Sequence, residues 1–172
     1  MDIFRASERV MAMDDAAWMR HANPWSVRSR FTCLPLFALS VWSREWLGVW
    51  ALAPVALTLA WMWINPRIFA PPANRDNWAS KGTFGERVYL NRRKIPVPGH
   101  HARAAGILTG IAAAGFVLMA IGLAIPDAGL TTAGLVSSML AKAWFFDRMV
   151  WLFEDMKAGH PEYARWLGEP AS

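Results

Sequence analysis

The stretch INPRIFAPPANRDNWASKGTFGERVYLNRRKIPVPGHHAR, from Ile64 to Arg103, decides how the chain is organised. It is a polar segment between two uncharged runs, each long enough to cross a lipid bilayer. It carries most of the side chains suited to chemistry, and it is neither rich in Gly and Ser nor of low complexity. A connection of this length is rarely a simple linker, so we predict that it folds as a cap on one end of the helices.

Composition indicates a membrane protein. The chain has 172 residues, of which 55% are hydrophobic, and it contains 11 Trp. This is more apolar and more aromatic than an ordinary soluble domain, and the length suits a single domain, 1–172. The segments 31–43, 46–64, 104–126 and 128–146 are uncharged apart from Lys142. The second and third reach the roughly 20 residues that a membrane-spanning helix needs.

The first apolar segment is short, since residues 31–43 cover only about 20 Å as a helix. This segment spans the bilayer only if its helix begins near Ser26. The Arg28 and Arg30 side chains would then extend to the headgroups, and Pro35 would kink the helix. The alternative is a re-entrant segment. That would leave three spans and would place the 65–103 loop on the opposite side from the N-terminus.

The distribution of basic residues favours four spans. Lys and Arg are concentrated before residue 31 and within 65–103, while the other connections hold Arg44 with Glu45, and Asp127. Cytoplasmic segments collect Lys and Arg, and all the basic segments fall inside only if the first segment spans. We therefore predict an all-α four-helix transmembrane bundle of two hairpins in the inner membrane. Its spans are about 26–43, 46–64, 104–125 and 128–146, with both termini and the 65–103 loop cytoplasmic.

This topology also explains the net charge of +5 as positive-inside bias and attraction to anionic lipid. We expect membrane lipids as partners and no nucleic acid. The first two dozen residues contain no signal peptide, and Met1, Met11 or Met13 is the start. Residues 1–13 are expected to form an interfacial helix, and 162–167 a short amphipathic helix after the Gly159-His160-Pro161 break.

Small residues recur at four-residue spacing in the third span, at Gly106, Gly110 and Ala114. Such a ridge lets two helix backbones approach closely, so we expect a close helix crossing at Gly110. The partner helix belongs to the same chain or to a second copy in a homo-oligomer, and the motif alone leaves both open.

Polar residues on the cytoplasmic side form the candidate site. Ionisable groups at this depth need partners to offset the loss of water, so we predict that they gather in one pocket. The predicted polar cluster consists of Asn23, Asn65, Arg67, Asp76, Glu86, Arg87, His100, His101, Asp147 and Arg148.

Several chemistries are excluded by residue type. The chain has four His, at 21, 100, 101 and 160, which do not form the HxxH boxes of a membrane di-iron enzyme, and no span holds a His for haem. Its single Cys33 excludes a CxxC pair, and no GxxxxGK[ST] loop is present. No catalytic residue, cofactor or metal site is predicted. His21, His100 and His101 are the imidazoles that would bind a metal, although an extended segment after Pro98 would point the last two apart.

Several phrases together resemble an uncharacterised family of small four-span integral membrane proteins of bacteria and archaea. They are HANPWS, WINPRIFAPP, DNWASK, GERVYLN, PGHH and WFFDRMVWLFED, within about residues 13–156. The resemblance implies that the polar cluster acts as one unit, and it carries no catalytic role to any residue.

Three classes of function fit these observations. The first is an accessory or scaffold module that contacts lipid, favoured by the small size and the glycine ridge. The second is a small membrane enzyme acting on a lipid or lipid-like substrate, with Asp76, Glu86, His100, His101, Asp147 and Arg148 as its acid, base and phosphate-binding groups. The third is a transporter or channel, which the scarcity of polar residues in the outer halves of the spans disfavours.

Overall fold

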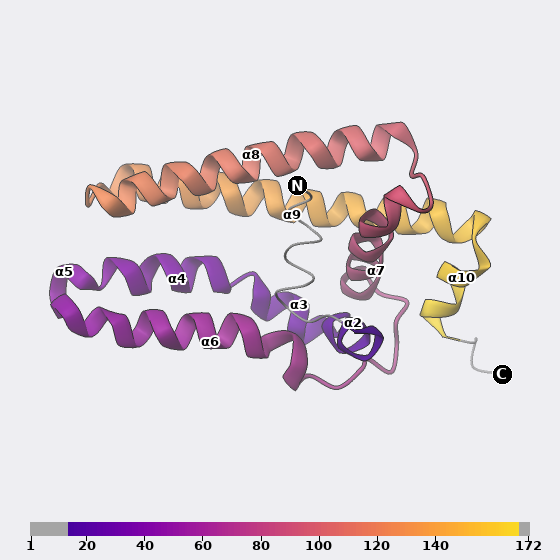
Figure 1. Ribbon diagram of the computed structural model, residues 1–172, viewed down its shortest axis with the longest axis horizontal. Helices are drawn as coiled ribbons and strands as arrows, with labels where there is room; N and C mark the ends of the chain where they lie inside the picture. The colour runs from indigo at the N-terminus through magenta and orange to yellow at the C-terminus, as the bar shows by residue number, and fades with distance from the viewer. Residues whose placement is uncertain (1–13, 169–172) are drawn as a thin grey trace.

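The computed structural model describes residues 14–168, and within this range the chain is helical and contains no strand (Figure 1). The predicted all-α class is confirmed. The interfacial helix expected for residues 1–13 lies outside the described residues. The helices are α2 (Asp15–His21), α3 (Pro24–Arg30), α4 (Cys33–Trp42), α5 (Arg44–Leu47), η1 (Gly48–Ala51), α6 (Leu52–Ile68), α7 (Trp78–Leu90), η2 (Asn91–Arg93), α8 (Gly99–Ala124), α9 (Ala128–Gly159), α10 (Pro161–Ala164) and η3 (Arg165–Leu167).

Two helical hairpins lie side by side, one made of α4 and α6 and the other of α8 and α9 (Figure 1). Helix α7 lies across one end, together with α2 and α10 (Figure 1). We call these three helices, with α3, η2 and η3, the cap. Within the first hairpin, the Ser40 and Thr58 hydroxyls hydrogen-bond at 2.9 Å, which satisfies two polar groups between otherwise apolar helices.

The first predicted span is interrupted. Helix α3 ends at Arg30 and α4 begins at Cys33. In between, the Phe31 and Thr32 amides donate to carbonyls three residues back, at 3.2 and 3.1 Å, as in a 3₁₀ turn. Pro35 explains the break, because it lacks the N–H that would bond to the Phe31 carbonyl in a continuous α-helix.

The second predicted span also has different bounds. The chain reverses through α5 and η1, with Gly48 in a positive-φ conformation of 56°, and α6 begins only at Leu52. The predicted span ends at Ile64, but α6 continues to Ile68 with Pro66 inside it. Pro66 has no N–H for the Met62 carbonyl, and the Arg67 guanidinium donates to the next carbonyl, that of Trp63.

Glycines do set the packing of α8 on α9, but they are not the predicted ones. A Cβ at Gly134 would overlap the backbone of Met119, and one at Gly122 would overlap Thr131. By contrast, a Cβ at Gly106 or Gly110 would meet no atom of the described residues within 4 Å. Residues 14–168 therefore make no close crossing at Gly110, and a crossing there with a second copy stays a prediction. Ala114 is exposed as well, so this ridge points away from the α8–α9 contact.

The cap is folded around a core that joins α7 to α9. Asn77 begins α7 as its N-cap, since its side chain accepts from the Ser80 amide at 3.0 Å. Gly82 and Gly85 allow α7 to approach α9 so closely that a Cβ at either would overlap Phe146 or Met149. The principal buried cluster comprises Ala22, Phe84, Val88, Tyr89, Ala105, Leu108, Phe145, Met149, Leu152, Phe153, Met156 and Tyr163.

Within residues 14–168, two helical segments are long and apolar enough to cross a membrane by length and composition, Pro24–Ile68 and Gly99–Ala124. The first folds back on itself as the α4–α6 hairpin (Figure 1). Large apolar side chains are exposed on both hairpins, including Leu39 at 63%, Leu57 at 71% and Leu140 at 66%.

Candidate functional site

Arg30 lies in a polar cluster where α2, α3 and α7 meet. Its guanidinium contacts Nε2 of His21 and approaches the His21 carbonyl at 3.3 Å and the Thr83 hydroxyl at 3.4 Å. His21 and Thr83 are both buried. Burial, reinforced by the Arg30 charge, holds the pKa of His21 well below its usual range. His21 is therefore a neutral imidazole near pH 7. The Arg30 guanidinium donates, and Nε2 of His21 accepts.

Glu86 belongs to the same region. Loss of solvation raises the pKa of its carboxyl, while the charges of Arg30 and Lys142 oppose that rise. The Nε of Arg30 and the Nδ1 of His21 are buried without a hydrogen-bond partner. This cluster thus holds an acid, a base and a cation at the junction of the two hairpins.

Asn23 and Asn65 support the backbone of the α3–α6 contact. Asn23 caps α3 by accepting from the Trp25 amide at 2.8 Å, and its amide group donates to the Ala70 carbonyl at 2.8 Å. Asn65 is fully buried and bridges Ser26 and Ser29, at 3.0 and 2.6 Å. Both side chains are used for structural hydrogen bonds.

Helix α7 is tied to α9 by polar contacts as well as by its glycines. Trp78 donates from Nε1 to the Asp147 carboxylate at 3.0 Å. Lys81 bridges Asp76, which lies just before α7, and Glu154 of α9, the latter at 2.8 Å. Hydrogen bonds to Asp76 and Glu154 raise the pKa of Lys81, and the hydrogen bond from Lys81 lowers the pKa of Asp76. Two polar contacts therefore link the 65–103 segment to α9, through Trp78 and Lys81.

Arg87 and Arg67 face other neighbours. Arg87 pairs with Asp15 of α2 and lies over the Trp166 ring, 4.5 Å from its centroid. Arg67 lies over the Trp63 ring at 4.0 Å. The Nε of Arg148 is buried without a hydrogen-bond partner.

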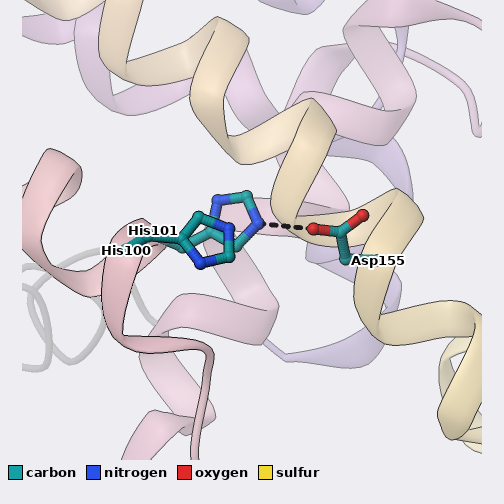
Figure 2. Close-up of side chains that lie close together, drawn as sticks. All are labelled: His100, His101 and Asp155. Atoms are coloured by element: carbon teal, nitrogen blue, oxygen red, sulfur yellow. Dashed lines mark hydrogen bonds and ion pairs between the residues drawn. The ribbon is translucent and has the colours of Figure 1, made fainter.

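His100, His101 and Asp155 form a third group, at the start of α8 and late in α9 (Figure 2). Nε2 of His101 lies 2.7 Å from the Asp155 carboxylate, and the two imidazole rings lie 4.1 Å apart between centroids. Helix α8 begins directly after Pro98, so both His residues are on its first turn. The expectation that they point apart from an extended segment is wrong, because Pro98 supplies the N-cap position of a helix.

The predicted polar residues lie in the cap and at the neighbouring ends of α6, α8 and α9, and they do not form one set of contacts. Asp76 and Asp147 lie at the α7–α9 contact, Arg87 pairs with Asp15 of α2, the asparagines bond within the α3–α6 contact, and His101 bonds to Asp155. Arg30, Lys81 and Asp155 take part in these contacts and were not among the predicted residues. Asp155 lies seven residues after Arg148, hence on nearly the same helix face, and that spacing was the available signal.

The class that fold and sequence define is a helical protein with two membrane-compatible segments and a folded polar cap. A family model matches residues 5–170, and the chain belongs to that family, DUF6653, which is described as a family of unknown function. Comparison with curated proteins and with solved structures gave no match.

Proposed function

We propose that the chain crosses the inner membrane four times and acts as an accessory or scaffold module. Its cap lies on the cytoplasmic side and contacts the lipid headgroups there. The observation that carries this proposal is the separation of surfaces along the molecule. Exposed large apolar side chains surround both hairpins, whereas ionisable groups are concentrated in the cap and a few, such as Arg44 and Asp127, lie at the opposite turns. A bilayer provides an apolar layer between two polar ones, and this surface matches it.

Four crossings are supported by the hairpin geometry. The apolar stretch Pro24–Ile68 reverses at α5 and η1, so its two limbs supply two crossings. Helix α6 has 17 residues and α8 has 26, which fit the thickness of a hydrocarbon core at about 1.5 Å per residue. Helix α9 has 32 residues, long enough to cross and then extend into the cap.

A structural role is favoured over an enzymatic one by how the polar residues are used. Most of the predicted cluster is engaged in capping, bridging or cation–π contacts that hold the cap to the helices. Exposed basic residues near the helix ends, among them Arg28, Lys94 and Arg103, are suited to anionic headgroups.

Labelling of single cysteines tests the topology. In a Cys33→Ala background, Asn74→Cys reports on the cap, and Glu45→Cys and Ala128→Cys report on the turns of the two hairpins. All three positions are exposed. With a membrane-impermeant maleimide, we expect the turn positions to react in intact cells and position 74 to react only in inverted vesicles.

Four outcomes would contradict parts of the proposal. Labelling of position 74 in intact cells would reverse the orientation, and opposite sidedness of positions 45 and 128 would show that the first hairpin does not cross. Release of the protein by a carbonate wash would remove the membrane assignment. The headgroup contact is tested separately. We expect anionic phosphatidylglycerol vesicles to raise the melting temperature of the protein more than phosphatidylcholine vesicles do. Equal effects of the two lipids would argue against a contact between the cap and anionic headgroups.

A further inference from the structure

The constellation of His100, His101 and Asp155 is not used by the proposed scaffold role. One ligand atom from each of the three residues can be chosen so that all lie within 4.8 Å of one another (Figure 2). The residues come from two helices far apart in the sequence, which the α8–α9 hairpin brings together. Imidazole nitrogen and carboxylate oxygen are both ligands of first-row divalent metals.

His101 is the fixed member of the group. Its side chain is buried, with the residue only 1% exposed, and Nε2 faces the Asp155 carboxylate at 2.7 Å. The other ring nitrogen, Nδ1, is also buried and has no hydrogen-bond partner. An ionised carboxylate only accepts hydrogen bonds, so Nε2 donates to Asp155 and Nδ1 of the neutral ring carries the unused electron pair.

His100 and Asp155 are the adjustable members. Both are exposed, so their side chains can rotate without disturbing the core. Ligand atoms bind a metal at about 2.0–2.2 Å, so two ligand atoms of one metal lie closer together than 4.8 Å. Rotation of the His100 and Asp155 side chains can bring the three ligand atoms to that spacing. The imidazole ring of His100 already lies beside that of His101, at 4.1 Å between centroids.

We propose that His100, His101 and Asp155 form a binding site for a divalent first-row transition metal such as Zn²⁺. The two imidazoles supply nitrogen ligands, and Asp155 acts as the third ligand or as the acceptor that orients His101, an arrangement common around metal-bound histidines. Mg²⁺ and Ca²⁺ prefer all-oxygen sites and are not expected here. Fewer than four protein ligands leave a coordination position open to solvent on the exposed side.

Metal titration of the purified protein tests this site. The protein is prepared in detergent, freed of any polyhistidine tag and stripped with a chelator, and Zn²⁺ binding is followed by calorimetry. We expect one equivalent of Zn²⁺ to bind to wild type and Co²⁺ to give visible d–d absorption. Mg²⁺ and Ca²⁺ should leave the heat signal at the level of dilution.

Two exposed positions provide the decisive variants. His100→Gln and Asp155→Asn should each weaken Zn²⁺ binding at least about tenfold, the lower range for loss of a group that holds or orients a metal ligand. His160→Gln and Glu162→Gln, which remove the same chemical groups outside the constellation, should retain the wild-type affinity. Added Zn²⁺ should raise the melting temperature of wild type and not that of the two site variants.

The proposal is overturned if wild type shows no saturable Zn²⁺ binding, or if His100→Gln and Asp155→Asn both bind with wild-type affinity. Unchanged melting temperatures of the metal-free variants would confirm that they fold. The measurement is made in detergent and is independent of membrane orientation, so a negative result would leave the topology proposal standing.

Discussion

Gly85 of α7 lies directly against Met149 of α9, so that a Cβ atom at position 85 would overlap the Met149 carbonyl oxygen. The cap and the second hairpin therefore meet through backbone, not only through side chains. Backbone atoms cannot rotate away as the end of a flexible side chain can, so this contact fixes how closely α7 approaches α9.

The first prediction is that Gly85→Ala destabilises the protein. The added methyl group must push the two helices apart, and overpacking of this kind costs about 1–3 kcal/mol. Thermal unfolding in detergent measures the loss. Gly106→Ala is the matched control, because nothing lies within 4 Å of a Cβ there and the helix gains up to about 1 kcal/mol from replacing Gly. Equal melting temperatures for the two variants would contradict the contact.

The second prediction separates packing within the chain from packing between copies. Gly134→Ala should lower the melting temperature, because its Cβ would overlap the backbone of Met119 in α8. Gly110→Leu should not lower monomer stability and can raise it by up to about 1 kcal/mol, because a Cβ there meets no described atom within 4 Å and Leu favours the helix over Gly. If Gly110→Leu changes the oligomer size in detergent, the Gly106, Gly110 and Ala114 ridge contacts a second copy. Strong destabilisation of a monomer by Gly110→Leu would show that the helices pack differently.

The sequence predicts helices better than it predicts contacts. A helix depends largely on local features, such as a long uncharged run and a capping side chain at its start. Helix α9 begins directly after its N-cap Asp127, and α7 directly after its N-cap Asn77. The Gly106 ridge shows the limit of such local signals. Small residues at four-residue spacing show that a close approach is possible there, but the face that is used depends on how α8 is rotated, and Gly115 and Gly122 face α9 instead.

The candidate site shows the same difference between what is local and what depends on packing. Residue type and position near the helix ends predict that the polar residues lie in or beside the cap, but they do not predict which residues pair. Lys81 reaches both Asp76 and Glu154, and His101 reaches Asp155, because α7 and α8 pack on α9 at particular positions. The crossing of α7 depends on Gly82 and Gly85, and that of α8 on Gly115, Gly122 and Gly134. The role of these glycines appears only once the helices are placed.

The third prediction concerns the pH dependence of stability. Burial holds the pKa of His21 well below its usual value near 6.5, so below about pH 6.5 the unfolded chain binds more protons at this position than the native chain. Stability from His21 is therefore present at neutral pH and is lost as pH falls below about 6.5. In melting experiments between pH 7.5 and 5.5, His21→Gln should lose less stability than wild type.

His160→Gln serves as the control for the third prediction, because it removes an imidazole from the α9–α10 junction and leaves the buried contact of His21 with Arg30 intact. If His21→Gln and wild type lose the same stability over this range, native His21 binds a proton as readily as the unfolded chain does. That result would contradict the neutral His21 described for the Arg30 cluster.

The fourth prediction tests the hydrogen bond that joins the cap to α9. Trp78 donates from its indole nitrogen to Asp147 at 3.0 Å, and its ring also packs edge-on against Phe146 at 4.8 Å between centroids. Trp78→Phe keeps an aromatic ring and removes the donor, while Asp147→Asn removes the charge of the acceptor. Because Trp78 is 44% exposed, each change should cost about 0.5–1.5 kcal/mol in thermal or denaturant unfolding.

The double variant should cost less than the sum of the single variants, since Trp78→Phe removes the donor and Asp147→Asn weakens the acceptor of the same hydrogen bond, and the coupling energy of the pair should be about 0.5–1 kcal/mol. Trp46→Phe provides the control, because Trp46 is 75% exposed in α5, at the opposite end of the molecule from α7, and should add independently to Asp147→Asn. Strict additivity of Trp78→Phe with Asp147→Asn would mean that the hydrogen bond does not hold the cap, and Lys81 with the Gly85 contact would then account for the attachment of α7 to α9.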